Sequence, residues 1–60
     1  MNGYIVQLVI KQKQYYWRLV APNGEVLAHS EQYFSKWNAK RAAKRLSKMT
    51  GFALTELNIH

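Results

Sequence analysis

Segment 36–49 carries several positive charges and no negative one, and this pattern constrains the fold more than any other feature of the chain. In an α-helix, which turns about 100° per residue, these cations occupy roughly half of the circumference. Small and apolar residues occupy the other half. The cations are Lys36, Lys40, Arg41, Lys44, Arg45 and Lys48, and the opposite residues are Ala39, Ala42, Ala43, Leu46 and Met49. The pattern predicts a helix that packs by a thin apolar back and exposes a cationic front.

Many of these cations follow one another at a spacing of one helical turn. Lys36, Lys40, Lys44 and Lys48 stand at i,i+4 from one another. Each like-charge pair at this spacing destabilises an isolated helix by about 0.2–0.5 kcal/mol. Because the chain tolerates this repulsion, we expect the cationic side of the helix to meet a negatively charged partner.

The composition indicates one small domain, spanning residues 1–60, with an acidic partner. A chain of this length lies near the lower limit for independent folding. Hydrophobic residues make up 48% of it, which is more than a lone small sphere hides easily, so we expect a homo-oligomer. The net charge of +6 favours nucleic acid, anionic lipid or an acidic protein as the partner.

Several classes of protein are not expected from this sequence. Without cysteine, the chain has neither a disulfide framework nor a thiolate metal site. No apolar run approaches the roughly 20 residues of a membrane span, and the N-terminal residues lack the pattern of a signal peptide. We therefore expect a cytoplasmic protein without a membrane partner.

The sequence also offers no sign of an enzyme. His29 and His60 do not have the spacing of metal ligands, and Glu25, Glu31 and Glu56 are too far apart in sequence to suggest a pair for acid–base catalysis. No glycine-rich loop for phosphate is present. We expect no catalytic residue, no metal, no cofactor and no small-molecule substrate.

The remaining pattern predicts strands on either side of the helix. Residues 4–10 alternate with a period of two, and Tyr4, Val6, Leu8 and Ile10 form the expected core face. The run Ala21-Pro22-Asn23-Gly24 predicts a tight turn, because Pro22 presets φ and Gly24 accepts a positive φ. The expected strands are 4–10, 15–20, 25–30 and 52–59.

The helix has a recognisable residue at each end. Ser35 is a suitable N-cap, and Phe34 before it is expected to pack onto the helix or a nearby core residue. Gly51 is suited to the left-handed residue that ends a helix, and Phe52 is expected to pack back toward Leu46.

A series of short motifs extends from residue 15 to residue 40. They are Tyr15-Tyr16-Trp17-Arg18-Leu19, Asn23-Gly24-Glu25-Val26-Leu27-Ala28, Ser30-Glu31, Tyr33, Ser35-Lys36 and Ala39-Lys40. In order and spacing, this series resembles the YegP-like family of small bacterial proteins. The resemblance implies an α+β fold, a β-β-β-α-β unit with an antiparallel sheet backed by one helix.

The same resemblance implies an assembly but no activity. Two such units share one sheet and exchange their last strands, so a chain with one unit is expected to form a homodimer with residues 52–59 swapped into the partner. The family has no established activity. Trp37 and the cluster Arg41, Lys44 and Arg45 are bulkier and more basic than the usual helix of the family.

The two tryptophans favour different interpretations. Trp17 shares a strand face with Tyr15 and Leu19 and is predicted to lie in the core. Trp37 falls near the middle of the cationic arc, where an indole is suited to stack on a base or fill a pocket of a protein partner. The alternative is that Trp37 leans over the sheet edge or into the dimer seam.

Arg18 and Tyr16 are expected on the other face of the second strand. A three-stranded sheet with one helix also resembles the arm-binding domains of phage integrases, in which the sheet enters the major groove. The outer sheet face here offers mainly Gln7, Lys11 and Arg18, which are few residues for reading bases.

The sequence thus favours a small non-catalytic binding module, a homodimer that binds the nucleic-acid backbone with its basic helix. The alternative is a protein-interaction module or inhibitor that docks on an acidic surface of a larger protein. The residues expected to bind are Lys36, Trp37, Lys40, Arg41, Lys44, Arg45, Lys48 and Arg18.

Overall fold

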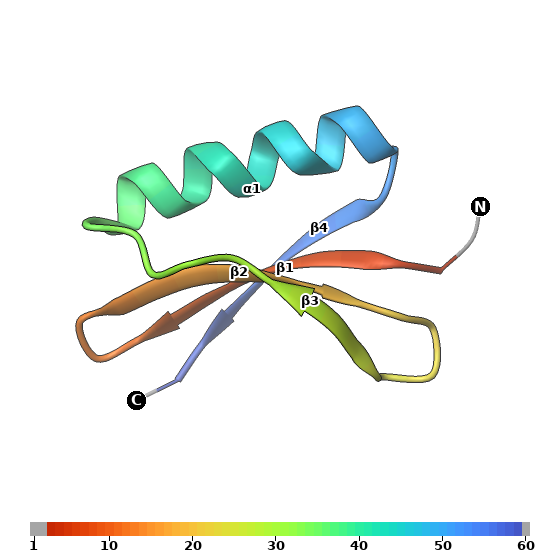
Figure 1. The fold of residues 1–60 in the computed structure, drawn as a ribbon, viewed down its shortest axis with the longest axis horizontal. Helices are drawn as coiled ribbons and strands as arrows, with labels where there is room; N and C mark the ends of the chain where they lie inside the picture. The colour runs from red at the N-terminus through yellow and green to blue at the C-terminus, as the bar shows by residue number, and fades with distance from the viewer. Residues whose placement is uncertain (1–2, 60) are drawn as a thin grey trace.

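A computed structural model describes residues 3–59 as a four-stranded sheet with one helix across a single face (Figure 1). The strand order in the sheet is β3-β2-β1-β4. The small α+β fold and the sequence of elements agree with the prediction. The elements are β1 (Ile5–Lys11), β2 (Gln14–Val20), β3 (Val26–His29), α1 (Lys36–Thr50) and β4 (Ala53–Asn58).

The sheet is mixed, so the expected antiparallel sheet is wrong at one edge. β1 pairs with β2, and β2 with β3, in antiparallel fashion, whereas β1 pairs with β4 in parallel. The cause is the number of chain reversals. Because α1 runs back across the sheet after the three antiparallel strands, β4 starts at the same end of the sheet as β1. Within this single chain, β4 lies beside its own β1.

The core lies between the apolar back of α1 and one face of the two central strands. Val6 and Leu8 of β1 are buried there, and Ala39 and Ala43 of α1 are both 0% exposed. Since alanine has the smallest side chain that still favours a helix, the two alanines let α1 approach the sheet closely. Residues that pack against this centre while remaining partly accessible are Ile10, Tyr15, Trp17, Leu19, Tyr33, Leu46 and Phe52. The expected core face of β1 is therefore confirmed at Val6 and Leu8.

Three side chains depart from the expected packing. Val9 points to the sheet face that α1 does not cover, yet it is 0% exposed, because β1 is flanked on both sides and its register partners there are Tyr16 and Leu57. Met49, placed on the apolar back, is 77% exposed, and Phe34 is 98% exposed. Met49 stands in the last turn of α1, at the border of the apolar arc.

The first hairpin, between β1 and β2, and the second hairpin, between β2 and β3, have different turns. In the second hairpin the predicted turn forms, because the Gly24 amide donates to the Ala21 carbonyl at 2.9 Å and Gly24 adopts φ +89°. In the first hairpin Lys13 adopts φ +57°, the left-handed region that favours glycine. Lys13 is the sole non-glycine residue with positive φ between residues 3 and 59.

The ends of α1 agree with the prediction, whereas Phe34 before the N-cap does not. The Asn38 amide donates to the Ser35 hydroxyl at 3.2 Å, and Gly51 ends the helix with φ +78°. Phe34 does not pack onto α1. Phe52 packs against the core cluster and stacks on Tyr4, with 5.4 Å between ring centroids.

Candidate functional site

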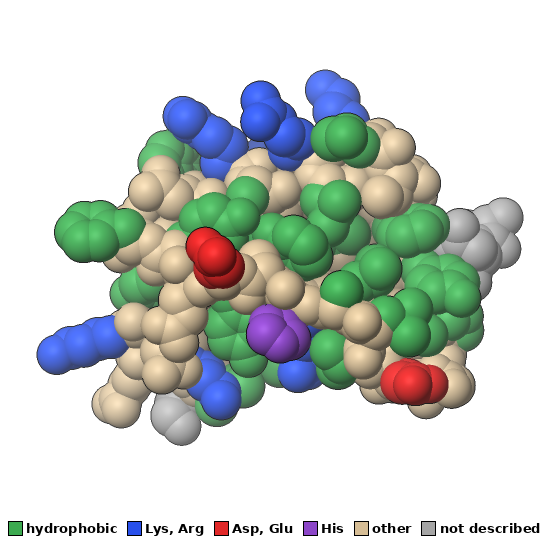
Figure 2. All heavy atoms as spheres, viewed as in Figure 1, with side chains coloured by type: hydrophobic (Ala, Val, Ile, Leu, Met, Phe, Trp, Pro, Cys, Tyr) green, Lys and Arg blue, Asp and Glu red, His purple; other side chains and the backbone are tan. Residues whose placement is uncertain are grey.

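The cations of α1 lie together on its outer side, which we call the cationic front. The front consists of Lys36, Lys40, Arg41, Lys44, Arg45 and Lys48; Lys40 is half-buried and the others are exposed. Figure 2 shows basic side chains projecting from the upper edge of the molecule, over α1, while the visible acidic side chains lie lower. The burial of Ala39 and Ala43 fixes this orientation, because turning α1 would bury cations.

The charges of the cationic front are not neutralised by other groups within residues 3–59. Across residues 3–59, none of its members forms an ion pair with a carboxylate. Helix α1 itself contains no acidic residue. Glu25, Glu31 and Glu56 stand in the second hairpin, in the loop after β3 and in β4. The front therefore retains its positive charge for a partner.

Trp37 lies within the cationic front, as its helical angle predicts. Its side chain is 67% exposed, and it borders a hollow of about 310 Å³ together with Lys40, Arg41 and Lys44. Within this chain the indole does not lean over the sheet. The helical angle therefore predicted the cationic neighbours of Trp37 within this chain.

A second groove follows the side of α1 that faces β2 and was not expected from the sequence. Its volume is about 560 Å³. Its walls combine aromatic and aliphatic residues with Arg41 and Arg45. The lining residues are Trp17, Tyr33, Asn38, Arg41, Ala42, Arg45, Leu46 and Met49. No local pattern signals this groove, because Trp17 of β2 is distant in the sequence from Tyr33 and α1, which complete the lining.

Trp17 belongs to a hydrogen-bonded unit that holds the chain after β3 against β2. Its indole Nε1 donates to the Tyr33 hydroxyl at 3.2 Å, and its backbone amide donates to the Ser30 hydroxyl at 3.0 Å. The Ser30 amide donates to the Trp17 carbonyl at 2.9 Å, and the Tyr33 amide to the Tyr15 carbonyl at 2.7 Å. These contacts confirm that Trp17 packs against the core and show that Ser30 and Tyr33 have structural roles.

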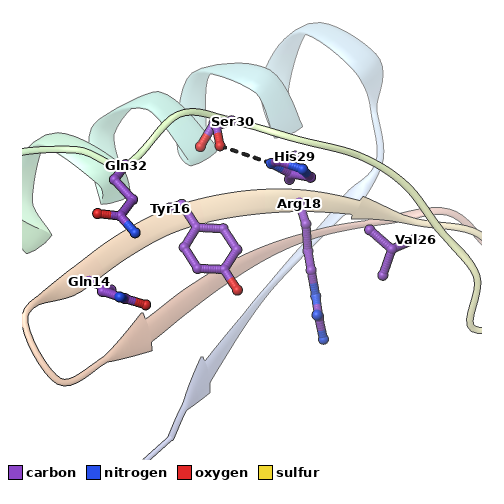
Figure 3. Close-up of a pocket in the computed structure, with 7 residues that line it drawn as sticks. All are labelled: Gln14, Tyr16, Arg18, Val26, His29, Ser30 and Gln32. Carbon is purple, nitrogen blue, oxygen red and sulfur yellow. Dashed lines mark hydrogen bonds between the residues drawn. The ribbon is translucent and has the colours of Figure 1, made fainter.

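Arg18 is not part of the cationic front, because it lies on the opposite face of the sheet. Its Nε donates to Gln7 Oε1 at 2.5 Å. Figure 3 shows Arg18 and Tyr16 projecting from β2 beside His29, where they line a shallow pocket of about 400 Å³. The structure thus separates Arg18 from the other predicted binding residues.

The remaining candidates for chemistry are few. Among residues 3–59 there is no group of three or more His, Cys, Asp or Glu side chains placed to hold a metal ion. His60 lies outside the described residues. In the same part of the chain, no helix has the length and apolar character required to cross a bilayer.

Comparison with known families gives a match to a domain of unknown function, DUF1508, over residues 11–50. The chain belongs to the DUF1508 family. This is the YegP-like family that the motifs indicated. No curated protein and no solved structure matches the chain.

The part of the chain that matches DUF1508 contains the hydrogen-bonded unit around Trp17. Of the motif residues, Trp17 bonds to both Ser30 and Tyr33, and Asn23 Oδ1 accepts from the Glu25 amide at 3.0 Å. These contacts stabilise the hairpin and the connection to α1. The matched residues 11–50 include both this hydrogen-bonded unit and nearly all of α1 with its cationic front.

Proposed function

We propose that this DUF1508 protein is a non-catalytic module that binds nucleic acid through the cationic front of α1. The proposal depends on one observation: six cations lie on one side of a single helix with no acid among them, and none has an ion-pair partner within residues 3–59. Cations spaced along a helix bind successive phosphates and release the counterions condensed there. Such binding is largely independent of base sequence.

The helix is suited to this role because its back and front have separate tasks. Ala39 and Ala43 anchor α1 to the sheet, so the long side chains on the front remain free to follow a phosphate backbone. The net charge of +6 adds long-range attraction that speeds association with polyanions.

The test is fluorescence anisotropy with labelled oligonucleotides between about 50 and 200 mM salt. The variant Arg41→Gln/Lys44→Gln/Arg45→Gln removes three phosphate contacts. We expect its slope of log affinity against log salt to become less negative by about 2 to 3, since each contact contributes about 0.7–0.9.

The matched control is Lys11→Gln/Lys13→Gln, which removes cations at the first hairpin instead of α1. The control is expected to keep the salt slope of the wild-type protein. If both variants weaken binding in proportion to the charge removed, the cationic front is not the binding face. If the wild-type protein binds no nucleic acid at the lower salt concentration, the proposal is wrong.

An acidic protein surface is the second candidate partner, and the exposure of Phe34 favours it. A phenylalanine ring that is 98% exposed beside the start of α1 is suited to fill a pocket of a partner. A pull-down from lysate with and without nuclease separates the two candidates. A partner that survives nuclease, and that Phe34→Ala releases at any salt concentration, supports the protein partner.

We also propose that the functional unit is a homodimer with exchanged C-terminal strands. Both edge strands support an assembly, because every residue of β3 is exposed and β4 is exposed except at Leu57. Val26, Leu27 and Leu54 add exposed apolar surface at these edges. In the exchanged dimer, β4 pairs with the partner's β1 in the parallel register that it has here with its own β1.

The absence of native cysteine makes a disulfide test of this exchange simple. Gln7 and Thr55 are register partners on β1 and β4. Co-refolding of a Gln7→Cys chain with a Thr55→Cys chain is expected to give a disulfide-linked dimer after oxidation. Light scattering that finds only a monomer at micromolar concentration, with no mixed disulfide, contradicts the exchange.

A further inference from the structure

The hollow beside Trp37 combines one flat aromatic face with three cationic side chains. Trp37, Lys40, Arg41 and Lys44 line it, and none of its lining residues is acidic. Its volume of about 310 Å³ lies at the lower end of the range for small-molecule pockets. These are the two elements that recognise a nucleotide, because an indole stacks on a base and cations bind phosphate.

The exposure of Trp37 bears on which form of nucleic acid fits. In a duplex the base faces are stacked on one another, so a helix that lies against the outside reaches phosphates and base edges. An unpaired strand offers free base faces to aromatic side chains. A front of cations alone is sufficient for a duplex, whereas an indole that is 67% exposed among them gains stacking contact from an unstacked base.

We propose that the Trp37 hollow holds one unpaired base, with the neighbouring phosphates bound by the cationic front, so that the preferred ligand is single-stranded nucleic acid. This inference rests on the nucleic-acid binding proposed above and adds the form of the strand. The 15 residues of α1 extend about 22 Å, at 1.5 Å per residue, which leaves room for further phosphates toward Lys48.

The experiment compares Trp37→Ala with the wild-type protein on a labelled single strand and on the duplex of the same sequence. Stacking of one base on an aromatic ring corresponds to about 5- to 150-fold in affinity. We expect Trp37→Ala to weaken single-strand binding by a factor in this range. Duplex affinity and the salt slope are expected to stay unchanged, because no charge is removed.

Phe34→Ala is the matched control, since Phe34 is an exposed aromatic three residues earlier that does not line the hollow. The control is expected to keep single-strand affinity within about twofold of the wild-type value, as for other surface substitutions away from the site. Intrinsic fluorescence gives a second readout. The single strand is expected to quench the tryptophan fluorescence of the wild-type protein. It is expected to quench the fluorescence of the Trp37→Ala variant, which retains Trp17, much less.

The outcomes separate this inference from the proposed function. Absence of binding to either nucleic acid overturns both. Equal affinity for both forms, with no effect of Trp37→Ala, overturns the single-strand inference and leaves backbone binding intact. Equal losses for Trp37→Ala and Phe34→Ala, or binding of polyglutamate as tight as that of the single strand and equally sensitive to Trp37→Ala, also overturn the inference.

Discussion

The two tryptophans of this chain stand in two regions that differ in almost every physical respect. Trp17 lies on β2, packs against the core and donates its indole hydrogen to Tyr33. Trp37 lies on the front of α1, is 67% exposed and is surrounded by cations. The polar groups of the first region are hydrogen-bonded to one another. In the second region, the cations have no ion-pair partner and the indole is mostly uncovered within residues 3–59.

The difference separates what makes the domain fold from what it offers to a partner. In the region of Trp17, hydrogen bonds join β2 to the segment after β3. The cationic front adds repulsion between like charges, which costs stability. A surface that costs stability is retained most readily where binding offsets that cost.

The largest expected contrast comes from replacing each tryptophan by alanine. Trp17→Ala is expected to lower the free energy of unfolding by about 3 kcal/mol, because it removes a large ring from the core and its bond to Tyr33. Trp37→Ala is expected to change the free energy of unfolding by less than about 0.5 kcal/mol. Urea denaturation followed by circular dichroism measures both. An equal decrease in the free energy of unfolding for the two variants would mean that Trp37 is also a structural residue.

A second contrast compares the back and the front of α1. Ala43 is 0% exposed, so Ala43→Leu overfills the space between α1 and β1 and is expected to cost about 2 kcal/mol. Lys44→Leu introduces the same side chain one residue later, on the front, and is expected to stay within about 0.5 kcal/mol of the wild-type protein. Thermal denaturation of the two variants is the measurement. An Ala43→Leu variant as stable as the wild-type protein would show that the core can accommodate a larger side chain at this position.

Local patterns predicted the elements and the cationic front because each depends on residues that are close in the sequence. The helix between Ser35 and Gly51 has its cap residues and its apolar stripe in one segment. The cationic neighbours of Trp37 lie on the same helix, so its helical angle was sufficient to predict them. The turn at Gly24 formed as predicted for the same reason.

Features that join distant segments were not predictable in this way. The parallel pairing of β4 with β1 depends on the direction of the chain after α1, and alternation within one strand carries no such information. The bond from Trp17 to Tyr33 and the groove beside α1 likewise arise from tertiary packing. The exposure of Phe34 and Met49 shows that the apolar character of a residue does not by itself determine its burial.

The hydrogen bond to Tyr33 offers a smaller test of the structural region. Tyr33→Phe removes the acceptor of the Trp17 indole and is expected to lower the free energy of unfolding by about 1 kcal/mol. Tyr16→Phe is the control, since its hydroxyl makes no hydrogen bond within residues 3–59, and less than about 0.5 kcal/mol is expected. Denaturant titration of both variants is the measurement. If the free energy of unfolding falls equally in the two variants, the hydrogen bond from the Trp17 indole contributes no net stability.

The smallest expected effect concerns a cation outside the front. Lys13 closes the first hairpin with φ +57°, a conformation that costs a residue with a Cβ about 1–2 kcal/mol and costs glycine almost nothing. Replacing Lys13 by glycine removes this strain, but part of the gain in stability is lost because glycine has more conformational freedom in the unfolded chain. Lys13→Gly is therefore expected to raise the free energy of unfolding by about 0.5 kcal/mol. The salt slope of nucleic-acid binding is expected to stay unchanged, although Lys44→Gln, which removes the same charge from the front, reduces it. A slope that falls equally in both variants would mean that total charge, rather than the face of α1, governs binding.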